Sequence, residues 1–273
     1  MKIIFLVFIL TLMSCADDSF KKVEALNTFR ILAITASNSE VAPGGSSVLQ
    51  LYVSDTKGDG RTISGTLEAC IDPGIAFGAT VSCDHDPLKA TAAYSIDTIN
   101  DADLGVGNLY TGFATATYTA TIPATILLGR TAREQYNGVS YIVNFSFTVD
   151  GLTVKSFKRI VATSRVSLNS NPTISNVLIN GNGASGKPNK DDLLSLTSST
   201  AEDYSYQNVD DSLEARSETL EVAWYVSEGE INKPKAYSSE TIRYKSIPPT
   251  STMLLITVLR DGRGGIAIHR EVF

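Results

Sequence analysis

The sequence is poor in the side chains that most enzymes use for acid–base and nucleophilic chemistry. Its 273 residues include two histidines, His85 and His269, and three cysteines. A catalytic triad needs a base that moves protons near neutral pH, and histidine takes that role most often. The nucleophile elbow G-x-S-x-G is also absent. We therefore expect a protein that is not an enzyme, with His85 in a loop and His269 on a terminal strand.

Basic clusters and phosphate-binding motifs are missing as well. The chain has 23 Lys and Arg against 29 Asp and Glu, which gives a formal net charge of −6. Nucleic-acid binding depends on neutralising phosphates, so we expect no nucleic-acid partner for this acidic chain. Gly181, Gly186 and Lys187 have P-loop spacing, but Pro188 stands where Ser or Thr is needed. We interpret that segment as a loop between strands.

Long helical repeats of Leu, Glu and Lys are likewise absent, whereas two-residue alternation is frequent from Thr28 onwards. The clearest example is VSYIVNFSFTV at 139–149, in which every odd-numbered residue is apolar. Such alternation predicts a strand with one face in a core. Asp150 and Gly151, which follow it, favour a tight hairpin. Many short strands separated by turn signals predict an all-β protein made of β-sandwiches.

The strands fall into two runs that look like diverged copies of one architecture. Each run opens near a proline and closes with a hairpin, the second of them at Asp261 and Gly262. Between the runs, the segment SLNSNP, Ser167–Pro172, has the small polar residues of a linker. In the second run Trp224 shares its face with apolar neighbours, which places it in a core. The expected domains are residues 28–166 and 173–273, joined by the linker 167–172.

Three positions resemble the framework of immunoglobulin-like domains. Tyr141, near the start of a penultimate strand, resembles the tyrosine corner. Trp224 resembles the buried tryptophan of the third strand, and Val143 takes the place of the second cysteine of antibody domains. The whole chain is similar to bacterial lipoproteins with tandem immunoglobulin-like domains. The resemblance implies two tandem immunoglobulin-like β-sandwiches without the usual inter-sheet disulfide.

The N-terminus carries the longest apolar stretch. Residues 3–12, after Lys2, are too few for a transmembrane helix of roughly 20 residues. They fit a signal peptide, whose apolar region has about 7–15 residues. Ser14 directly before Cys15, with a leucine at the third position before it, resembles the lipobox of bacterial lipoproteins. The resemblance implies that residues 1–14 are a cleaved signal peptide and that Cys15 is lipidated.

A lipidated Cys15 fixes the expected location. Each buried CH₂ contributes about 0.8 kcal/mol, so more than one acyl chain, such as palmitate, anchors a protein stably in a membrane. Residues 15–27 would be the lipidated tether. In this family an aspartate directly after the cysteine favours the inner membrane; here Ala16 follows, so we expect the outer membrane. The alternatives are a secreted chain without lipid and an uncleaved membrane anchor.

Cys70 and Cys83 form an even pair in a chain that we expect to be exported. An oxidising compartment favours a disulfide between such cysteines, and Pro73 and Gly74 supply a turn between them. A metal site is the alternative, but only His85 lies near and there is no second cysteine pair. We therefore expect a Cys70–Cys83 disulfide, no metal and no other cofactor.

The acidic segment 201–218 is the main candidate for a contact surface. It carries six carboxylates, and we expect residues 199–217 to form a long loop, a feature that is often functional. Tyr204 and Tyr206 within it are the candidate partner-binding residues, because aromatic side chains supply contact area. Calcium binding by this segment, or by 100–103, is the alternative, although neither matches the EF-hand pattern.

Taken together, the patterns predict a membrane-anchored lipoprotein of the cell envelope. We expect a binding, adhesion or spacer module, with a protein or a glycan as its partner and no catalysis of its own. Fold analogy carries this expectation. Two alternatives belong to other classes: a periplasmic accessory or scaffold subunit of an envelope machine, and an enzyme that uses carboxylates on a sandwich scaffold.

The lipid anchor can be tested directly. A bacterial host that expresses the chain should incorporate labelled fatty acid into it, because the segment before Cys15 directs acylation of that cysteine. The Cys15→Ala variant, made in the same cells, should carry none of the label. Equal labelling of the two chains, measured after gel separation, would show that Cys15 is not the lipid site.

Overall fold

The computed structural model describes residues 24–26, 28–55, 61–74, 81–97, 117–247 and 252–273. The expected signal peptide and Cys15 lie outside these residues. The described part consists of strands and turns, with one short helix, α2 (Ala132–Asn137). The prediction of an all-β protein is therefore confirmed. No helical segment of the described part has the length and apolar character that a membrane span needs.

The first sandwich has one sheet of three strands and one of five. The smaller sheet contains, in spatial order, β1 (Arg30–Ala36), β3 (Ser46–Ser54) and β6 (Thr117–Thr121). The larger sheet contains β2 (Glu40–Val41), β8 (Leu152–Ala162), β7 (Val139–Val149), β4 (Thr62–Ile71) and β5 (Ala90–Asp97). All neighbours are antiparallel except β2 and β8, which run parallel. The division of strands between the two sheets is that of an immunoglobulin-like sandwich.

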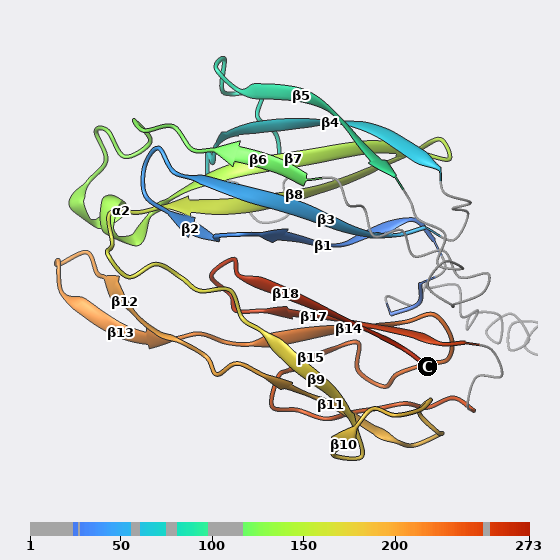
Figure 1. The fold of residues 1–273 in the computed structure, drawn as a ribbon. Coiled ribbons are helices and arrows are strands. Elements are labelled where there is room, and N and C mark those ends of the chain that lie inside the picture. The colour runs from blue at the N-terminus through green and yellow to red at the C-terminus, as the bar shows by residue number, and fades with distance from the viewer. Residues whose placement is uncertain (1–23, 27, 56–60, 75–80, 98–116, 248–251) are drawn as a thin grey trace, which may run out of the picture.

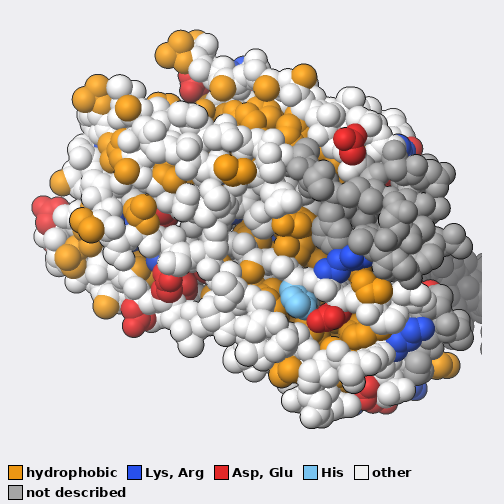
Figure 2. Space-filling model, viewed as in Figure 1, with side chains coloured by type: hydrophobic (Ala, Val, Ile, Leu, Met, Phe, Trp, Pro, Cys, Tyr) orange, Lys and Arg blue, Asp and Glu red, His pale blue; other side chains and the backbone are white. Residues whose placement is uncertain are grey.

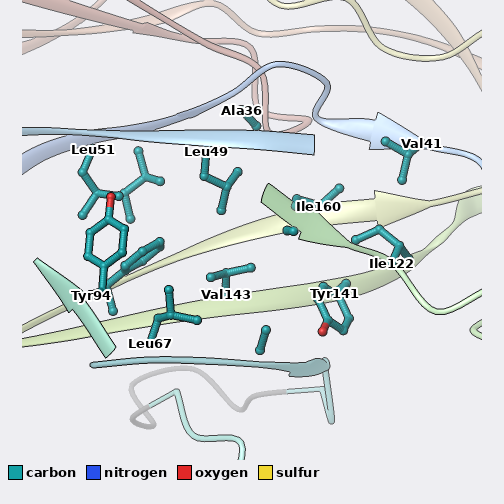
Figure 3. Packing of buried hydrophobic residues seen from close by; sticks show 14 of the residues in the cluster. Ala36, Val41, Leu49, Leu51, Leu67, Tyr94, Ile122, Tyr141, Val143 and Ile160 are labelled. Carbon is teal, nitrogen blue, oxygen red and sulfur yellow. The ribbon is translucent and has the colours of Figure 1, made fainter. Parts of the chain in front are cut away.

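Alternate residues of these strands build the first core, which Figure 3 shows between the two sheets. Leu49 and Leu51 of β3 point from the smaller sheet toward Val143 of β7, and all three side chains are fully buried. Burying such a side chain stabilises the fold by about 1.5–3 kcal/mol. All odd-numbered residues of β7 are buried, which confirms the alternation predicted for 139–149.

The outer face of β7 is also partly buried, and the disulfide explains why. Cys70, on β4, is bonded to Cys83 with a Cα–Cα distance of 5.7 Å, and both residues are buried. The bond holds the segment around Cys83 over the larger sheet, where the side-chain amide of Asn144 donates to the carbonyl oxygen of Val81 (3.2 Å). Ile142, whose position in the alternation predicts an outward side chain, is fully buried on this covered face. The predicted disulfide is confirmed as a local staple.

The second sandwich consists of two antiparallel four-stranded sheets. One contains, in spatial order, β10 (Asn182–Gly183), β9 (Ile174–Ile179), β11 (Leu193–Ser198) and β16 (Ile242–Arg243). The other contains β15 (Lys235–Tyr237), β14 (Glu221–Val226), β17 (Leu254–Arg260) and β18 (Ile266–Val272). Trp224 of β14 is 1% exposed and belongs to the core between these sheets, as predicted.

The segment 199–217 is not the long loop that the sequence suggests. It contains a hairpin of β12 (Asp203–Gln207) and β13 (Leu213–Ser217). Neither strand has a fully buried residue, so the hairpin lacks the apolar alternation that marks the other strands. Cross-strand contacts stabilise it instead, and the guanidinium of Arg216 lies 3.8 Å from the ring centroid of Tyr206.

The two sandwiches stack, so that the molecule has four layers of sheet (Figure 1). The outer face of β1 meets the outer face of the sheet that contains β17 and β18. Leu32 and Ala33 of β1 pack there with Ile256 and Val258 of β17 in a buried apolar cluster. The two domains expected from the sequence therefore share an apolar interface as well as a connecting chain.

Residues 24–26 also belong to this folded body. The amide of Leu26 donates to the carbonyl oxygen of Val226 (3.1 Å), and the amide of Val226 donates to that of Glu24 (2.9 Å). Residues 24–26 of the expected tether 15–27 thus pack on the second sandwich. Val226 is the last residue of β14, whereas the hairpin β12–β13 comes just before the first residue of β14 in the chain. Residues 24–26 and the hairpin therefore lie at opposite ends of β14. The chain therefore enters the fold at the end of the molecule opposite the hairpin (Figure 1).

Replacing the buried tryptophan tests the second core. Trp224→Ala should destabilise the second sandwich by about 3–5 kcal/mol, because it removes the largest fully buried side chain and leaves a cavity. The control Tyr237→Ala removes an aromatic ring that is 52% exposed on the neighbouring strand. It should change the stability by less than about 0.5 kcal/mol. Equal urea midpoints for the two variants would contradict a core role for Trp224.

Candidate functional site

A cleft of about 430 Å³ opens where the two sandwiches meet. Its walls come from β8 and the end of α2 in the first sandwich, and from β12 and the turn between β17 and β18 in the second. These elements lie together at the end of the molecule opposite the C-terminus (Figure 1). Ligand-binding sites usually have volumes of about 300–1,000 Å³. The cleft is therefore the leading candidate site in the described part of the chain.

The turn between β17 and β18 is held by its own aspartate. Asp261 is buried, and its Oδ1 accepts hydrogen bonds from the backbone amides of Arg263 (2.8 Å) and Gly265 (2.9 Å). Gly262 and Gly264 have φ angles of 80° and 105°, which glycine adopts without strain. The hairpin predicted at Asp261 and Gly262 is confirmed. Its turn directs Arg263 toward the first sandwich.

A buried carboxylate of the first sandwich receives Arg263. Glu40, on β2, is 3% exposed, and its Oε1 accepts hydrogen bonds from Nη2 of Arg263 (2.9 Å) and Nη2 of Arg165 (2.6 Å). Nη1 of Arg263 donates to Oε1 of Glu218 (3.2 Å). Buried charges are tolerated when opposite charges and hydrogen bonds surround them. We call these four residues, Glu40, Arg165, Glu218 and Arg263, the ionic network.

The segment 167–172, expected as a linker, is fastened to both sandwiches. The side-chain amide of Asn169 donates to Oδ2 of Asp261 (2.7 Å) and to Oγ of Ser39 (2.9 Å). Its backbone amide donates to Oε2 of Glu40 (2.9 Å). The segment therefore connects the two sandwiches and also fixes their relative orientation.

Lys158 forms a further link between the sandwiches. It extends from β8, and its amino group donates to the carbonyl oxygen of Gly264 in the β17–β18 turn. Its side chain is buried, and this burial lowers the pKa of the amino group to about 8 although nearby Asp261 opposes the shift. Burial also raises the pKa of Glu218. Lys158 and Glu218 are both buried, so the interface excludes much of the water around these charged groups.

Tyr204 and Tyr206, the candidate partner-binding residues, both line the cleft. Both are half-buried, and each ring has a guanidinium over one face. Arg263 lies 4.4 Å from the ring centroid of Tyr204, and Arg216 lies 3.8 Å from that of Tyr206. Such contacts contribute about 0.5–1 kcal/mol at exposed sites. Tyr204 thus contacts the ionic network through Arg263, whereas Tyr206 is held by Arg216 within the hairpin. Partner binding by the two tyrosines stays a prediction.

Asn137, at the end of α2, seats the hairpin against the first sandwich. Its Nδ2 donates to the carbonyl oxygen of Gln207 (2.8 Å), and its Oδ1 accepts from the amide of the same residue (2.9 Å). The helix begins with a capping box, in which Thr131 and Glu134 exchange hydrogen bonds with each other's backbone amides. The helix was not among the expected elements, although the T-x-x-E signal that marks its start is present at 131–134.

Cations outnumber carboxylates among the described residues that line the cleft. The cations are Lys158, Arg159, Arg165 and Arg263, and the carboxylate is Glu40. Because the whole chain is acidic, this excess is a local property of the site. On the face drawn in Figure 2, by contrast, the described Lys and Arg side chains are scattered rather than gathered in one broad patch.

Arg159 is the least engaged of these cations. Its Nε lies 2.6 Å from Oδ2 of Asp72, and its guanidinium lies 4.9 Å from the ring centroid of Phe157. Its side chain is 39% exposed. No acceptor among the described residues lies within hydrogen-bonding distance of its two terminal nitrogens. A ligand in the cleft would therefore meet free guanidinium donors at Arg159.

The acidic segment 201–218 forms no metal site in the structure. Among the described residues, no group of three or more His, Cys, Asp or Glu side chains is arranged to hold a metal ion. The carboxylates of the segment are used locally: Asp210 accepts a hydrogen bond from Ser212, and Glu214 pairs with Arg216 (2.8 Å). The other acidic stretch, 100–103, lies outside the described residues.

Neither histidine lines the cleft. His85 is exposed near the disulfide, and its Nε2 lies 3.1 Å from the carbonyl oxygen of Ile71. His269, on β18, has its Nε2 2.8 Å from Oε1 of Glu271. The positions agree with the interpretation of His85 as a loop residue and of His269 as a strand residue.

Comparisons with known proteins give no family for this chain. No protein-family model and no curated protein matches its sequence. Among solved structures it is similar to dimeric latent PorU from Porphyromonas gingivalis, with 9% sequence identity and a TM-score of 0.23. The match covers 94% of this chain but 25% of the PorU chain, so the chain spans a quarter of that length. A TM-score this low carries no argument about the function.

The ionic network can be tested by removing its central carboxylate. Glu40→Ala should destabilise the protein by about 3–5 kcal/mol, because it leaves Arg165 and Arg263 buried without their shared partner. Glu240→Ala, the control, removes a carboxylate that pairs with Lys233 at the surface (2.6 Å), and it should have little effect.

Urea unfolding followed by tryptophan fluorescence and by circular dichroism measures both variants. Fluorescence reports the second sandwich, which contains Trp224, and circular dichroism reports both sandwiches. The unchanged chain should give coincident curves, whereas Glu40→Ala should separate them because the coupling is lost. Coincident curves for Glu40→Ala, at the midpoint of Glu240→Ala, would show that the network does not couple the sandwiches.

Proposed function

We propose that this protein is a lipid-anchored binding module of the cell envelope, with no catalysis of its own, and that it receives its partner in the cleft. One observation carries the proposal. The cleft has walls from both sandwiches, and buried ion pairs between Glu40, Arg165 and Arg263 hold those walls in one arrangement. A site of this kind is suited to recognition, because little conformational freedom is lost when a partner binds.

The composition of the cleft supports a binding role. Tyrosine and arginine are enriched among the residues that contribute most to binding at protein interfaces. Here Tyr204, Tyr206 and three arginines line a single hollow. Each tyrosine ring is held by a guanidinium, so its orientation is set before the partner arrives. Residues that are fixed in advance contribute more of their contact energy to affinity.

The expected anchor also agrees with this site. Cys15, as the lipidated residue, would lie shortly before residues 24–26, which pack beside the end of β14 that is remote from the hairpin. The cleft lies at the hairpin end (Figure 1). An anchor at Cys15, in the outer membrane by our expectation, would therefore leave the cleft pointing away from the bilayer, where a partner can reach it.

Site-specific photo-crosslinking in intact cells tests the proposal. A photoreactive amino acid at Ser140, which lines the cleft, should give a discrete adduct with one partner after illumination. The same amino acid at Leu193, on an outer sheet of the second sandwich and 39% exposed, should give no such adduct. Identical adducts from both positions, or none from Ser140, would contradict a partner site in the cleft.

A further inference from the structure

We propose that the ligand of the cleft is an acidic peptide segment, which binds in an extended conformation along the free edge of β8. The inference rests on the proposed function, since it takes the cleft as the partner site. Three observations carry it: the charge of the cleft, the position of its arginines over aromatic rings, and the unpaired edge of β8.

Charge selects an anionic ligand. The single carboxylate on the walls, Glu40, is buried, and both of its oxygens already accept hydrogen bonds. It therefore presents no open negative charge to a ligand. Arg159 presents a guanidinium with two unengaged terminal nitrogens, and a guanidinium binds a carboxylate with two parallel hydrogen bonds. Lys155, which is exposed two residues before Phe157 on β8, extends the same charge along the strand.

The arginines also favour a peptide over a glycan. A sugar ring is commonly held by an open aromatic face, and the three aromatic rings on the cleft walls are Phe157, Tyr204 and Tyr206. Each of them has a guanidinium over one face. This leaves less ring surface for a sugar. The donor edges of the guanidinium groups are the remaining recognition elements, and clusters of arginine are a known way to read acidic peptide motifs.

The edge of β8 supplies backbone hydrogen bonds for an extended chain. On the side of β8 away from β7, β2 pairs with Val161 and Ala162. Near Arg159 the β17–β18 turn covers this edge, since a Cβ on Gly264 would lie 3.8 Å from the Arg159 carbonyl oxygen. Along Leu152–Phe157 no strand among the described residues pairs with this edge. The amide of Val161 donates to the carbonyl oxygen of Ser39 on this side (2.9 Å). The backbone N–H and C=O groups of successive residues point to opposite edges of a strand. Phe157 is an even number of residues from Val161, so its N–H and C=O point to the same edge as those of Val161. A peptide added there would continue the sheet.

The same edge discourages unwanted partners. Lysine and arginine on an edge strand disfavour pairing with other strands, because a basic strand is repelled and a neutral one would take water from the charges. An acidic strand is attracted instead, because its carboxylates form ion pairs with Lys155 and Arg159 when it pairs with β8. One set of charges thus protects the edge of β8 and selects the ligand that can use it.

Fluorescence anisotropy tests the proposal with the full chain in mild detergent. The probe is a fluorescein-labelled peptide of four Glu-Val repeats, and the control peptide has four Lys-Val repeats. The acidic peptide should bind and the basic one should not. Binding should weaken at about 1 M salt, where the Debye length falls to about 3 Å. Arg159→Gln should weaken it about tenfold, because it removes a charged hydrogen-bond donor.

A matched variant and modified peptides separate charge from backbone pairing. Arg243→Gln removes an arginine that lies outside the cleft and pairs with Asp191 (3.5 Å), and it should leave affinity unchanged. Two further acidic peptides are N-methylated, one on the Glu amides and one on the Val amides. One of them should lose about tenfold or more in affinity, since only one set of amides faces β8.

Equal binding of all three acidic peptides would overturn edge pairing, and equal binding by Arg159→Gln would overturn the role of the guanidinium. Tight binding of an oligogalacturonate probe that depends on Arg159, with no binding of the peptides, would identify an acidic glycan instead. In either case an adduct at Ser140 in cells would leave the proposed function intact. No adduct and no peptide binding would overturn both.

Discussion

The arrangement of this molecule depends on one buried carboxylate, that of Glu40. It lies in a short strand of the first sandwich, where solvent reaches almost none of it. A charge in such a place is tolerated only with close partners, and its partners come from elsewhere: Arg165 and Asn169 near the connection, and Arg263 in the last turn. Satisfying this carboxylate therefore brings together the first sandwich, the connecting segment and the second sandwich.

The cleft follows from the same constraint. Once Arg263 is fixed on Glu40, its guanidinium stacks on Tyr204 and places β12 beside the first sandwich. Asn137 then seats the hairpin through two hydrogen bonds to Gln207. Because the hairpin has no buried face of its own, these contacts give it its position. A polar segment without a core thus becomes one wall of a defined hollow.

The sequence predicts what is decided locally and misses what is decided across the chain. Alternation in β7, the core position of Trp224 and the disulfide pair each depend on short patterns, and all three are confirmed. The hairpin β12–β13 has no buried apolar residues at alternate positions, so its sequence predicts a loop. Glu40 and Arg263 are 223 positions apart. No local pattern marks either residue, because an isolated Glu or Arg usually lies in solvent.

The interface combines an apolar part and an ionic part, and the two parts have different roles. The apolar cluster around Leu32 and Ile256 stabilises the contact between the sandwiches by removing apolar surface from water. Apolar contacts are non-directional, however, so they would also permit slightly shifted orientations of one sandwich on the other. Replacing a buried ion pair with apolar residues is often neutral for stability. We infer that the contribution of the ionic network is one orientation of the sandwiches. A cleft whose walls belong to two domains has a fixed shape only if that orientation is unique.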